Sequence, residues 1–140
     1  MDGYSQEFII SFGDCDPAGI VYYPNFYRWM DATFHGFLRA RSIGHTALCR
    51  QFDAIGLGLM ETGMRFRAPG QDGDLLVFAI DAIDWSERSY RLSYSARVGA
   101  RVLAEGFETR GLFRQDAEGR LRAAPVAPLR AILGCGAPPA

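Results

Sequence analysis

The sequence predicts an α+β fold in which one long helix packs against an antiparallel sheet. Apolar side chains in residues 24–41 recur at the i, i+3, i+4, i+7 spacing of a helix, whereas apolar residues in the second half recur with the period of two typical of strands. One helix followed by several strands with short turns favours a single sheet covered by that helix. The length of 140 residues corresponds to one domain, so we expect residues 1–140 to form it.

The first half contains the predicted helix and the loop that precedes it. A strand is expected over Glu7–Phe12, followed by a loop over Gly13–Tyr23 that is rich in Asp, Gly and Pro. Pro24 suits the first turn of a helix, where its missing N–H costs nothing, and the helix is expected to continue to about Arg41. Apolar residues on several faces predict that more than half of it is buried. A short helix is expected over Gly44–Phe52.

The second half is predicted to be strands joined by short turns. Leu75–Ile83 is apolar at both parities, so we expect burial on both faces. Tyr90–Val98 alternates apolar residues with Arg and Ser, which is typical of a half-exposed strand. The other expected elements are strands over Leu57–Phe66 and Val102–Phe113, turns at 68–74, 99–100 and 116–119, and a short helix over Pro128–Leu133.

The charged residues exclude several function classes. With 15 basic and 16 acidic residues the net charge is -1, which argues against a polycationic nucleic-acid binder and a basic membrane-surface protein. Every basic residue is Arg, so Schiff-base, pyridoxal-phosphate and P-loop lysine chemistry are excluded. With 2 His and 3 Cys, hydrolysis would have to use carboxylates, tyrosines or backbone amides.

The cysteines and the hydropathy predict a cytoplasmic protein. Cys15, Cys49 and Cys135 form no CxxC pair, which argues against a zinc or redox motif and favours reduced thiols. Cys15 lies between two acids, which should raise its pKa, so we interpret it as a packing residue. Neither a signal peptide nor an apolar run of about 20 residues is present, so no membrane segment is expected.

Residues 13–31, GDCDPAGIVYYPNFYRWMD, contain the densest set of polar groups beside the predicted buried helix. A helix N-terminus offers free N–H groups and about half a positive charge. An N–H donor that holds a developing oxyanion contributes roughly 3–4 kcal/mol to catalysis. The ordinary alternative is that Asp14 and Asp16 form turns, as Asp often does beside Pro and Gly.

This segment resembles the signature of the 4-hydroxybenzoyl-CoA thioesterase family of hotdog-fold proteins. The resemblance lies in DCDPAGIV at residues 14–21, YPN at 23–25 and RWMDA at 28–32, with weaker anchors at 64–73, 85–90 and 120–123. It implies a curved antiparallel sheet of five or six strands wrapped around one long central helix. It also implies hydrolysis of an acyl-CoA thioester with no cofactor and no metal, CoA being part of the substrate.

The resemblance assigns candidate roles to individual residues. The second Asp of the signature, Asp16, is implied to be catalytic, either as a nucleophile that forms a mixed anhydride or as a general base toward water. The backbone N–H of Tyr23 is the implied oxyanion donor. Asp31 is implied to face the acyl pocket and meet a ring hydroxyl; alternatively, it pairs with Arg28 or is solvated.

Binding of CoA requires cations for its phosphates, a role that Arg fills well. Arg88 and Ser89 match family positions that touch the nucleotide end of CoA, the alternative being a solvated turn. Glu61 is interpreted as a structural or pocket-rim residue. His35 and His45 are interpreted as too few and too isolated for a metal site.

Three functions remain open at this point. The first is a thioesterase for an aromatic, 4-hydroxybenzoyl-CoA-like substrate; the second is a short- or medium-chain acyl-CoA thioesterase. The third is a non-catalytic module that binds acyl-CoA or acyl-carrier protein. A dehydratase is disfavoured because neither His lies in a suitable context. The family implies a homotetramer, a dimer of dimers, with sites between protomers, whereas the charge and hydropathy predict neither nucleic acid nor membrane as partner.

Overall fold

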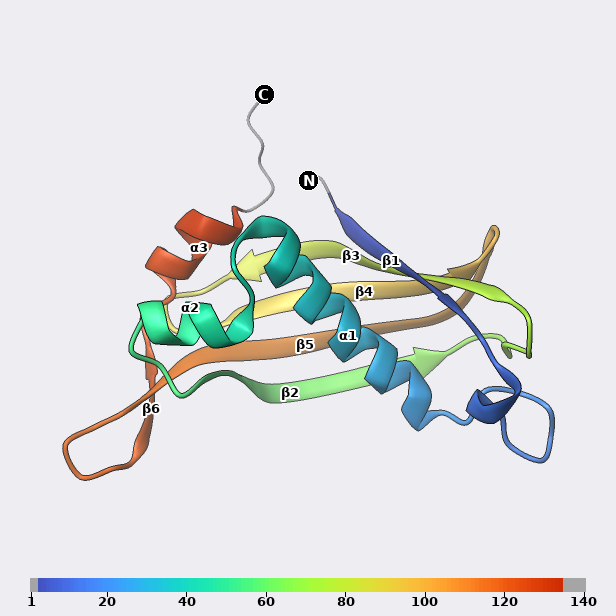
Figure 1. Ribbon diagram of the computed structural model, residues 1–140, viewed down its shortest axis with the longest axis horizontal. Coiled ribbons are helices and arrows are strands. Elements are labelled where there is room, and N and C mark those ends of the chain that lie inside the picture. Colours follow the sequence, from blue (N-terminus) through green and yellow to red (C-terminus); the bar gives the residue numbers. More distant parts are fainter. Residues whose placement is uncertain (1–2, 135–140) are drawn as a thin grey trace.

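A computed structural model describes residues 3–134 and contains a six-stranded antiparallel sheet that curves around one long helix (Figure 1). The strand order is β1-β3-β4-β5-β2, and β6 pairs with β5. This is the hotdog architecture, as predicted; Cys135 lies outside the described residues. The elements are β1 (Tyr4–Ile9), a 3-10 turn (Phe12–Asp14), α1 (Pro24–Arg41), α2 (His45–Gln51), β2 (Gly56–Phe66), β3 (Leu75–Trp85), β4 (Tyr90–Val98), β5 (Arg101–Gln115), β6 (Leu121–Ala124) and α3 (Ala127–Leu133).

Helix α1 has the predicted bounds and packs against the sheet. Its large buried residues face the apolar side chains of β3, β4 and β5 in one core. Burial of each large apolar side chain contributes about 1.5–3 kcal/mol, so this face holds the helix firmly in place. No helix among residues 3–134 is long and apolar enough to cross a membrane. The buried residues of α1 are Phe26, Trp29, Met30, Thr33, Phe34, Gly36, Phe37 and Leu38.

The largest differences from the predicted element bounds are at β1 and β6. β1 begins at Tyr4 and ends at Ile9, each three residues before the predicted bound, and it ends there because the next residues hydrogen-bond elsewhere. The N–H of Ile10 donates to Asp74 at 2.9 Å, and Phe12–Asp14 form one 3-10 turn. β6 was not predicted, because its 4 residues show little alternation of apolar and polar side chains. It forms through its pairing with β5.

In a single copy of the protein β3 is fully buried on one face only, so the prediction of burial on both faces is wrong. Leu76, Phe78 and Ile80 are at most 1% exposed, but Leu75 is 43% exposed, and Val77 and Ala79 are only half-buried. α1 covers one face of the sheet (Figure 1), whereas no described element covers the other side of β3 to the same extent.

A buried ion pair joins two residues of β5 beneath α1. The guanidinium of Arg110 donates to both oxygens of Glu108, with Nε–Oε1 at 3.0 Å and the second N–O pair at 2.8 Å. The hydroxyl of Tyr94 donates to the same carboxylate at 2.6 Å. Burial, together with the Glu108 carboxylate, raises the pKa of Tyr94 well above its usual value, so the phenol remains a donor.

Arg110→Leu should lower the free energy of unfolding by about 3–5 kcal/mol, because it leaves the Glu108 carboxylate buried without its counter-charge. The double variant Glu108→Gln/Arg110→Leu should recover most of that loss, since no unpaired charge remains. Urea denaturation of both variants measures the difference. Equal losses in the two variants would contradict the pairing.

Candidate active site

Asp14 ties the loop before α1 to the first turns of that helix. Its carboxylate accepts hydrogen bonds from the Ser11 N–H and hydroxyl, both at 2.9 Å, and pairs with Arg28 at 3.1 Å. Its carbonyl accepts from the Tyr22 N–H at 2.9 Å and the Asn25 amide at 2.8 Å. All of these bonds hold the loop in shape, so Asp14 fits the structural interpretation.

Asp16 lies at the tip of the same loop and is half-buried. One carboxylate oxygen accepts the Ala18 N–H at 2.9 Å, and the Asp16 carbonyl accepts the Gly19 N–H at 2.8 Å. The positive φ of Gly19, 80°, suits this tight turn. The second carboxylate oxygen accepts no hydrogen bond from residues 3–134. Asp16 therefore forms the turn and still presents an oxygen without a protein partner.

Tyr23 caps α1 and presents a backbone donor. Its N–H donates to no acceptor within the described part of the chain, whereas the following N–H groups of Asn25 and Phe26 bond back to Tyr22 and Tyr23 at 3.0 Å. This unpaired N–H lies at the positive end of the helix dipole, where a developing anion is stabilised. The bridge between Cys15 and Val21 closes the loop and keeps Asp16 and Tyr23 at the same end of the molecule.

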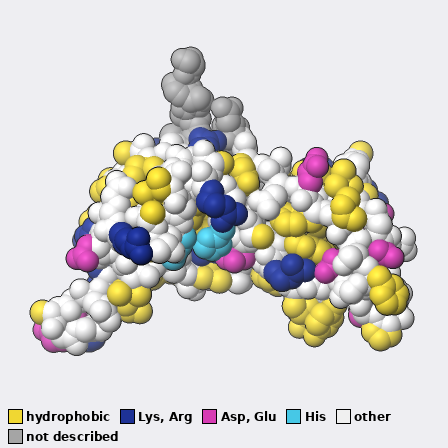
Figure 2. Space-filling model, in the orientation of Figure 1, with side chains coloured by type: hydrophobic (Ala, Val, Ile, Leu, Met, Phe, Trp, Pro, Cys, Tyr) yellow, Lys and Arg dark blue, Asp and Glu magenta, His cyan; other side chains and the backbone are white. Residues whose placement is uncertain are grey.

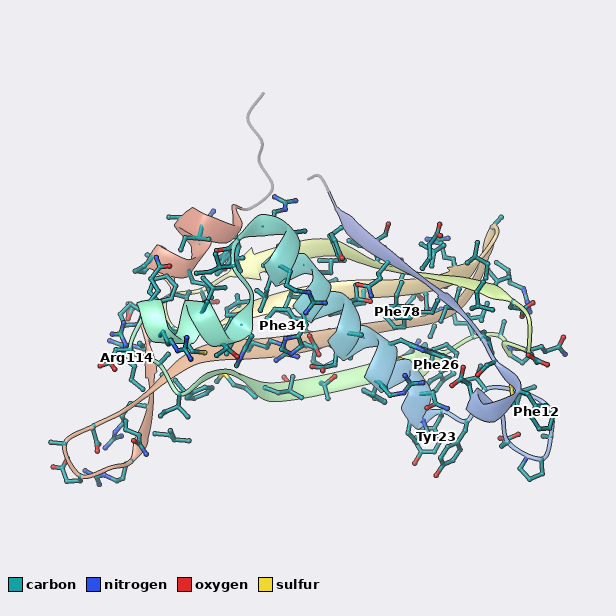
Figure 3. All side chains as sticks on the ribbon, in the orientation of Figure 1. Phe12, Tyr23, Phe26, Phe34, Phe78 and Arg114 are labelled. Carbon is teal, nitrogen blue, oxygen red and sulfur yellow. The ribbon has the colours of Figure 1, made fainter. Side chains whose placement is uncertain are left out.

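A hollow of about 410 Å³ lies beside Tyr23 and is mostly apolar. The rings of Phe26 and Phe66 form part of its wall, with centroids 5.5 Å apart, and Figure 3 shows Tyr23 and Phe26 together at the start of α1. The Val21 N–H donates to Gly70 at 2.9 Å and fixes the loop against the opposite wall. The lining residues are Ile20, Val21, Tyr23, Phe26, Phe66, Arg67, Ala68, Pro69 and Gly70.

Asp31 is an exposed residue of α1, two turns after the helix start. One of its oxygens accepts from Arg110 at 3.2 Å and lies 3.6 Å from the Nε2 of His35. The hydrogen bond from His35, followed by the Arg110 charge, lowers the pKa of Asp31 despite partial burial. Pairing with Arg28 is therefore wrong: Arg28 binds Asp14 instead.

The two histidines are not isolated from each other, which corrects the sequence interpretation. The rings of His35 on α1 and His45 on α2 lie 5.3 Å apart, and Figure 2 shows histidine and arginine side chains together on this face. Burial, His35 and Arg110 lower the pKa of His45, whose Nε2 accepts the Leu57 N–H at 3.2 Å. Among residues 3–134 no group of three His, Cys, Asp or Glu is placed to hold a metal.

Arg88 and Ser89 lie in the turn between β3 and β4, far from the loop at residues 13–23. Arg88 donates to the carbonyl of Ala123 at 3.0 Å and pairs with Glu87 at 3.3 Å. β3 begins beside that loop and runs 11 residues away from it, a span of about 35 Å. The structure therefore places Asp16 in the loop that leads directly into the Tyr23 cap of α1, whereas Arg88 lies in the β3–β4 turn at the opposite end of the sheet (Figure 1).

Sequence reasoning missed the buried pair on β5. Glu108 and Arg110 share the parity of Ala104 and Leu112, so opposite charges two residues apart on a core-facing row would have predicted an ion pair. Of the other candidates, Glu61 is exposed beside a bulge of β2.

Cys15 packs against the core, and its pKa is raised by desolvation and then by Asp72 and Asp14. The sequence analysis predicted a raised pKa for Cys15 but attributed it only to the two flanking acids.

Comparisons with known proteins agree with this geometry. No protein-family model matches the sequence. A curated relative, 4-hydroxybenzoyl-CoA thioesterase of Pseudomonas sp. (strain CBS-3), is 29% identical over 82 residues, which span 58% of each chain. A solved structure of a mutant 4-hydroxybenzoyl-CoA thioesterase with 4-hydroxybenzoyl-CoA has a TM-score of 0.83 and 25% identity, covering 97% of this chain and 100% of the other.

A gentisyl-CoA thioesterase structure is 32% identical with a TM-score of 0.68, covering 76% of this chain and 87% of the other. These similarities agree with the loop at residues 13–23 and with the sheet wrapped around α1. The chain belongs to the hotdog-fold thioesterase family that includes 4-hydroxybenzoyl-CoA thioesterase.

Proposed function

We propose that this protein hydrolyses an aromatic acyl-CoA thioester, of the 4-hydroxybenzoyl-CoA type, to the free acid and CoA. The proposal rests on two groups that have no hydrogen-bond partner among residues 3–134. One is the N–H of Tyr23 at the start of α1, and the other is a carboxylate oxygen of Asp16 in the loop that precedes it. These are the two groups that ester-type hydrolysis requires: a donor for the oxyanion and a base or nucleophile.

In this proposal the thioester carbonyl oxygen accepts the Tyr23 N–H. Asp16 then attacks the carbonyl carbon, expels the CoA thiolate and leaves a mixed anhydride that water hydrolyses. Alternatively, Asp16 takes a proton from a water molecule that attacks the carbonyl directly. Trapping with hydroxylamine separates the two, because only attack by Asp16 forms a mixed anhydride, which hydroxylamine can convert to an acyl hydroxamate during turnover. Neither route uses a metal or an organic cofactor.

Asp16→Asn should lower kcat by about a thousandfold or more and change KM little, since the amide neither attacks nor takes a proton but can still accept the Ala18 N–H. Thiol release from acyl-CoA measures both constants. Near-wild-type turnover by this variant would refute the proposed function.

Asp14→Asn is the matched control, two residues away in the same loop. Its carboxylate binds Ser11 and Arg28 rather than facing substrate, so the substitution should lower the melting temperature more than Asp16→Asn does. A larger loss of kcat than in Asp16→Asn would exchange the proposed roles of the two carboxylates.

The aromatic substrate is favoured by the position of Asp31. Its Cα lies seven residues, or about 10 Å, along α1 from Pro24, and its exposed carboxylate can accept a hydrogen bond from a ring hydroxyl. Two relatives are named for hydroxylated aromatic acyl-CoA substrates. The alternative is an alkyl substrate, for which exposed Leu59 and Met60 on β2 offer apolar surface.

Asp31→Ala should reduce the preference for 4-hydroxybenzoyl-CoA over benzoyl-CoA by about tenfold or more, because it removes a hydrogen bond to a charged acceptor. Values of kcat/KM for hydroxybenzoyl-, benzoyl-, phenylacetyl- and medium-chain acyl-CoA give the comparison. Faster hydrolysis of the medium-chain substrate by the wild type would favour the alkyl alternative. CoA binding without thiol release from any thioester would favour a binding module.

Assembly completes the proposed site. Within one chain, Arg88 follows the far end of β3, whose 11 residues run about 35 Å away from the Asp16 loop, so Arg88 and Ser89 meet the CoA bound there only if a second copy supplies them. The half-exposed apolar residues of β3 are a surface that another copy would cover. We therefore propose a cytoplasmic homotetramer, a dimer of dimers, whose free Cys15 and Cys49 suit a reducing compartment.

Arg88→Ala should raise KM for acyl-CoA several-fold and leave kcat nearly unchanged, because a phosphate contact is lost in ground and transition states alike. Arg120→Ala, another exposed arginine, is the control. Light scattering should give four times the monomer mass. A fully active monomer would contradict the shared site.

A further inference from the structure

The guanidinium of Arg110 is held from several sides and is almost completely buried. Besides Glu108, it donates to the carbonyl of Leu57 at 3.0 Å and stacks over the ring of Phe34 at 4.0 Å. Its side chain is 7% exposed. These three contacts, with Glu108, Leu57 and Phe34, leave the planar group one orientation, since a guanidinium has its donors in a fixed fork.

The remaining contact of Arg110 is with Asp31. Both the Arg110 bond at 3.2 Å and the His35 contact at 3.6 Å go to the same carboxylate oxygen, Oδ1. The other oxygen, Oδ2, has no partner among residues 3–134, and the side chain is 58% exposed. Asp31 thus has one oxygen anchored to a buried cation and one oxygen open to a ligand.

We propose that Arg110, held by Glu108, is a positioning residue that fixes the Asp31 carboxylate and so selects acyl groups whose far end carries a hydrogen-bond donor. This inference rests on the proposed function. The preferred substrate class is a hydroxylated aryl-CoA, and acyl groups ending in a carboxylate are rejected by like charge. Arg110 touches neither the thioester nor Asp16; it acts only through Asp31.

The physical reason lies in the flexibility of an exposed Asp side chain. Without an anchor, the carboxylate samples several rotamers, and a ligand must restrict them at an entropic cost. Arg110 imposes that restriction before binding, through a chain of contacts that begins with the Tyr94 hydroxyl and Glu108 in the core. His35 also contacts Oδ1, but at 3.6 Å and from a half-buried ring, so it restrains the carboxylate less firmly than Arg110 does at 3.2 Å.

The test compares kcat/KM for 4-hydroxybenzoyl-CoA with that for benzoyl-CoA. Arg110→Lys keeps the charge but cannot span Glu108, Leu57 and Asp31 together, and it should reduce this ratio about tenfold, mainly through the hydroxylated substrate. Glu108→Gln/Arg110→Leu, which buries no unpaired charge, should reduce the ratio similarly if Arg110→Lys folds poorly. Arg114→Lys is the matched control: it lies on the same strand, donates to Phe52 instead, and should leave the ratio unchanged.

A double-mutant cycle with Asp31→Ala separates positioning from a general structural role. In the Asp31→Ala background, Arg110→Lys should leave the ratio unchanged, because the residue through which it acts is gone. Equal losses for both substrates, or a similar fall in the ratio without Asp31, would overturn the inference while leaving thioester hydrolysis in place. Absence of thiol release by the wild type would instead refute the proposed function and this inference with it.

Discussion

Burial of α1 against the sheet is the constraint on which the rest of the structure depends. The helix is held by a row of aromatic and aliphatic side chains, Phe26, Trp29, Phe34 and Phe37 among them, each at most 4% exposed. A helix fixed along its length is fixed at its end, so the unpaired N–H of Tyr23 has a defined direction. The loop at residues 13–23, which contains Asp16, is then fixed to the first turns of this helix by a few bonds, chiefly those of Asp14.

The same burial explains why ionised groups are tolerated beneath the helix. Glu108 and Arg110 lie under α1 where an unpaired charge would be very unfavourable, and each satisfies the other while Tyr94 and Leu57 take further bonds. A hydrophobic pair of similar volume would stabilise the fold as well or better. The charged pair therefore adds little stability to the fold. Its proposed role is to position Asp31, the surface residue that Arg110 contacts.

The extent to which the sequence predicted the structure differs between local and long-range features. The bounds of α1 followed from its apolar spacing and Pro24, and the turn at Gly99 followed from a glycine that adopts a φ of 60°. β1 was misplaced because hydrogen bonds from Ile10 to a distant segment decide where it ends. The partners of Asp31 come from α1 and from β5, 79 residues away, so no local pattern could have identified them all.

The candidate site divides in the same way. The Asp16 turn and the Tyr23 cap are local, so one short motif was sufficient to predict both. Arg88 is bonded to Ala123 at the far end of the sheet, and no arrangement of a single curved chain brings it to Asp16. In the proposed mechanism, chemistry at the thioester therefore depends on one loop of one chain, whereas recognition of the rest of the substrate depends on surfaces far from that loop. Substitutions in the loop should accordingly act on turnover, and substitutions at the distant surfaces on affinity and selectivity.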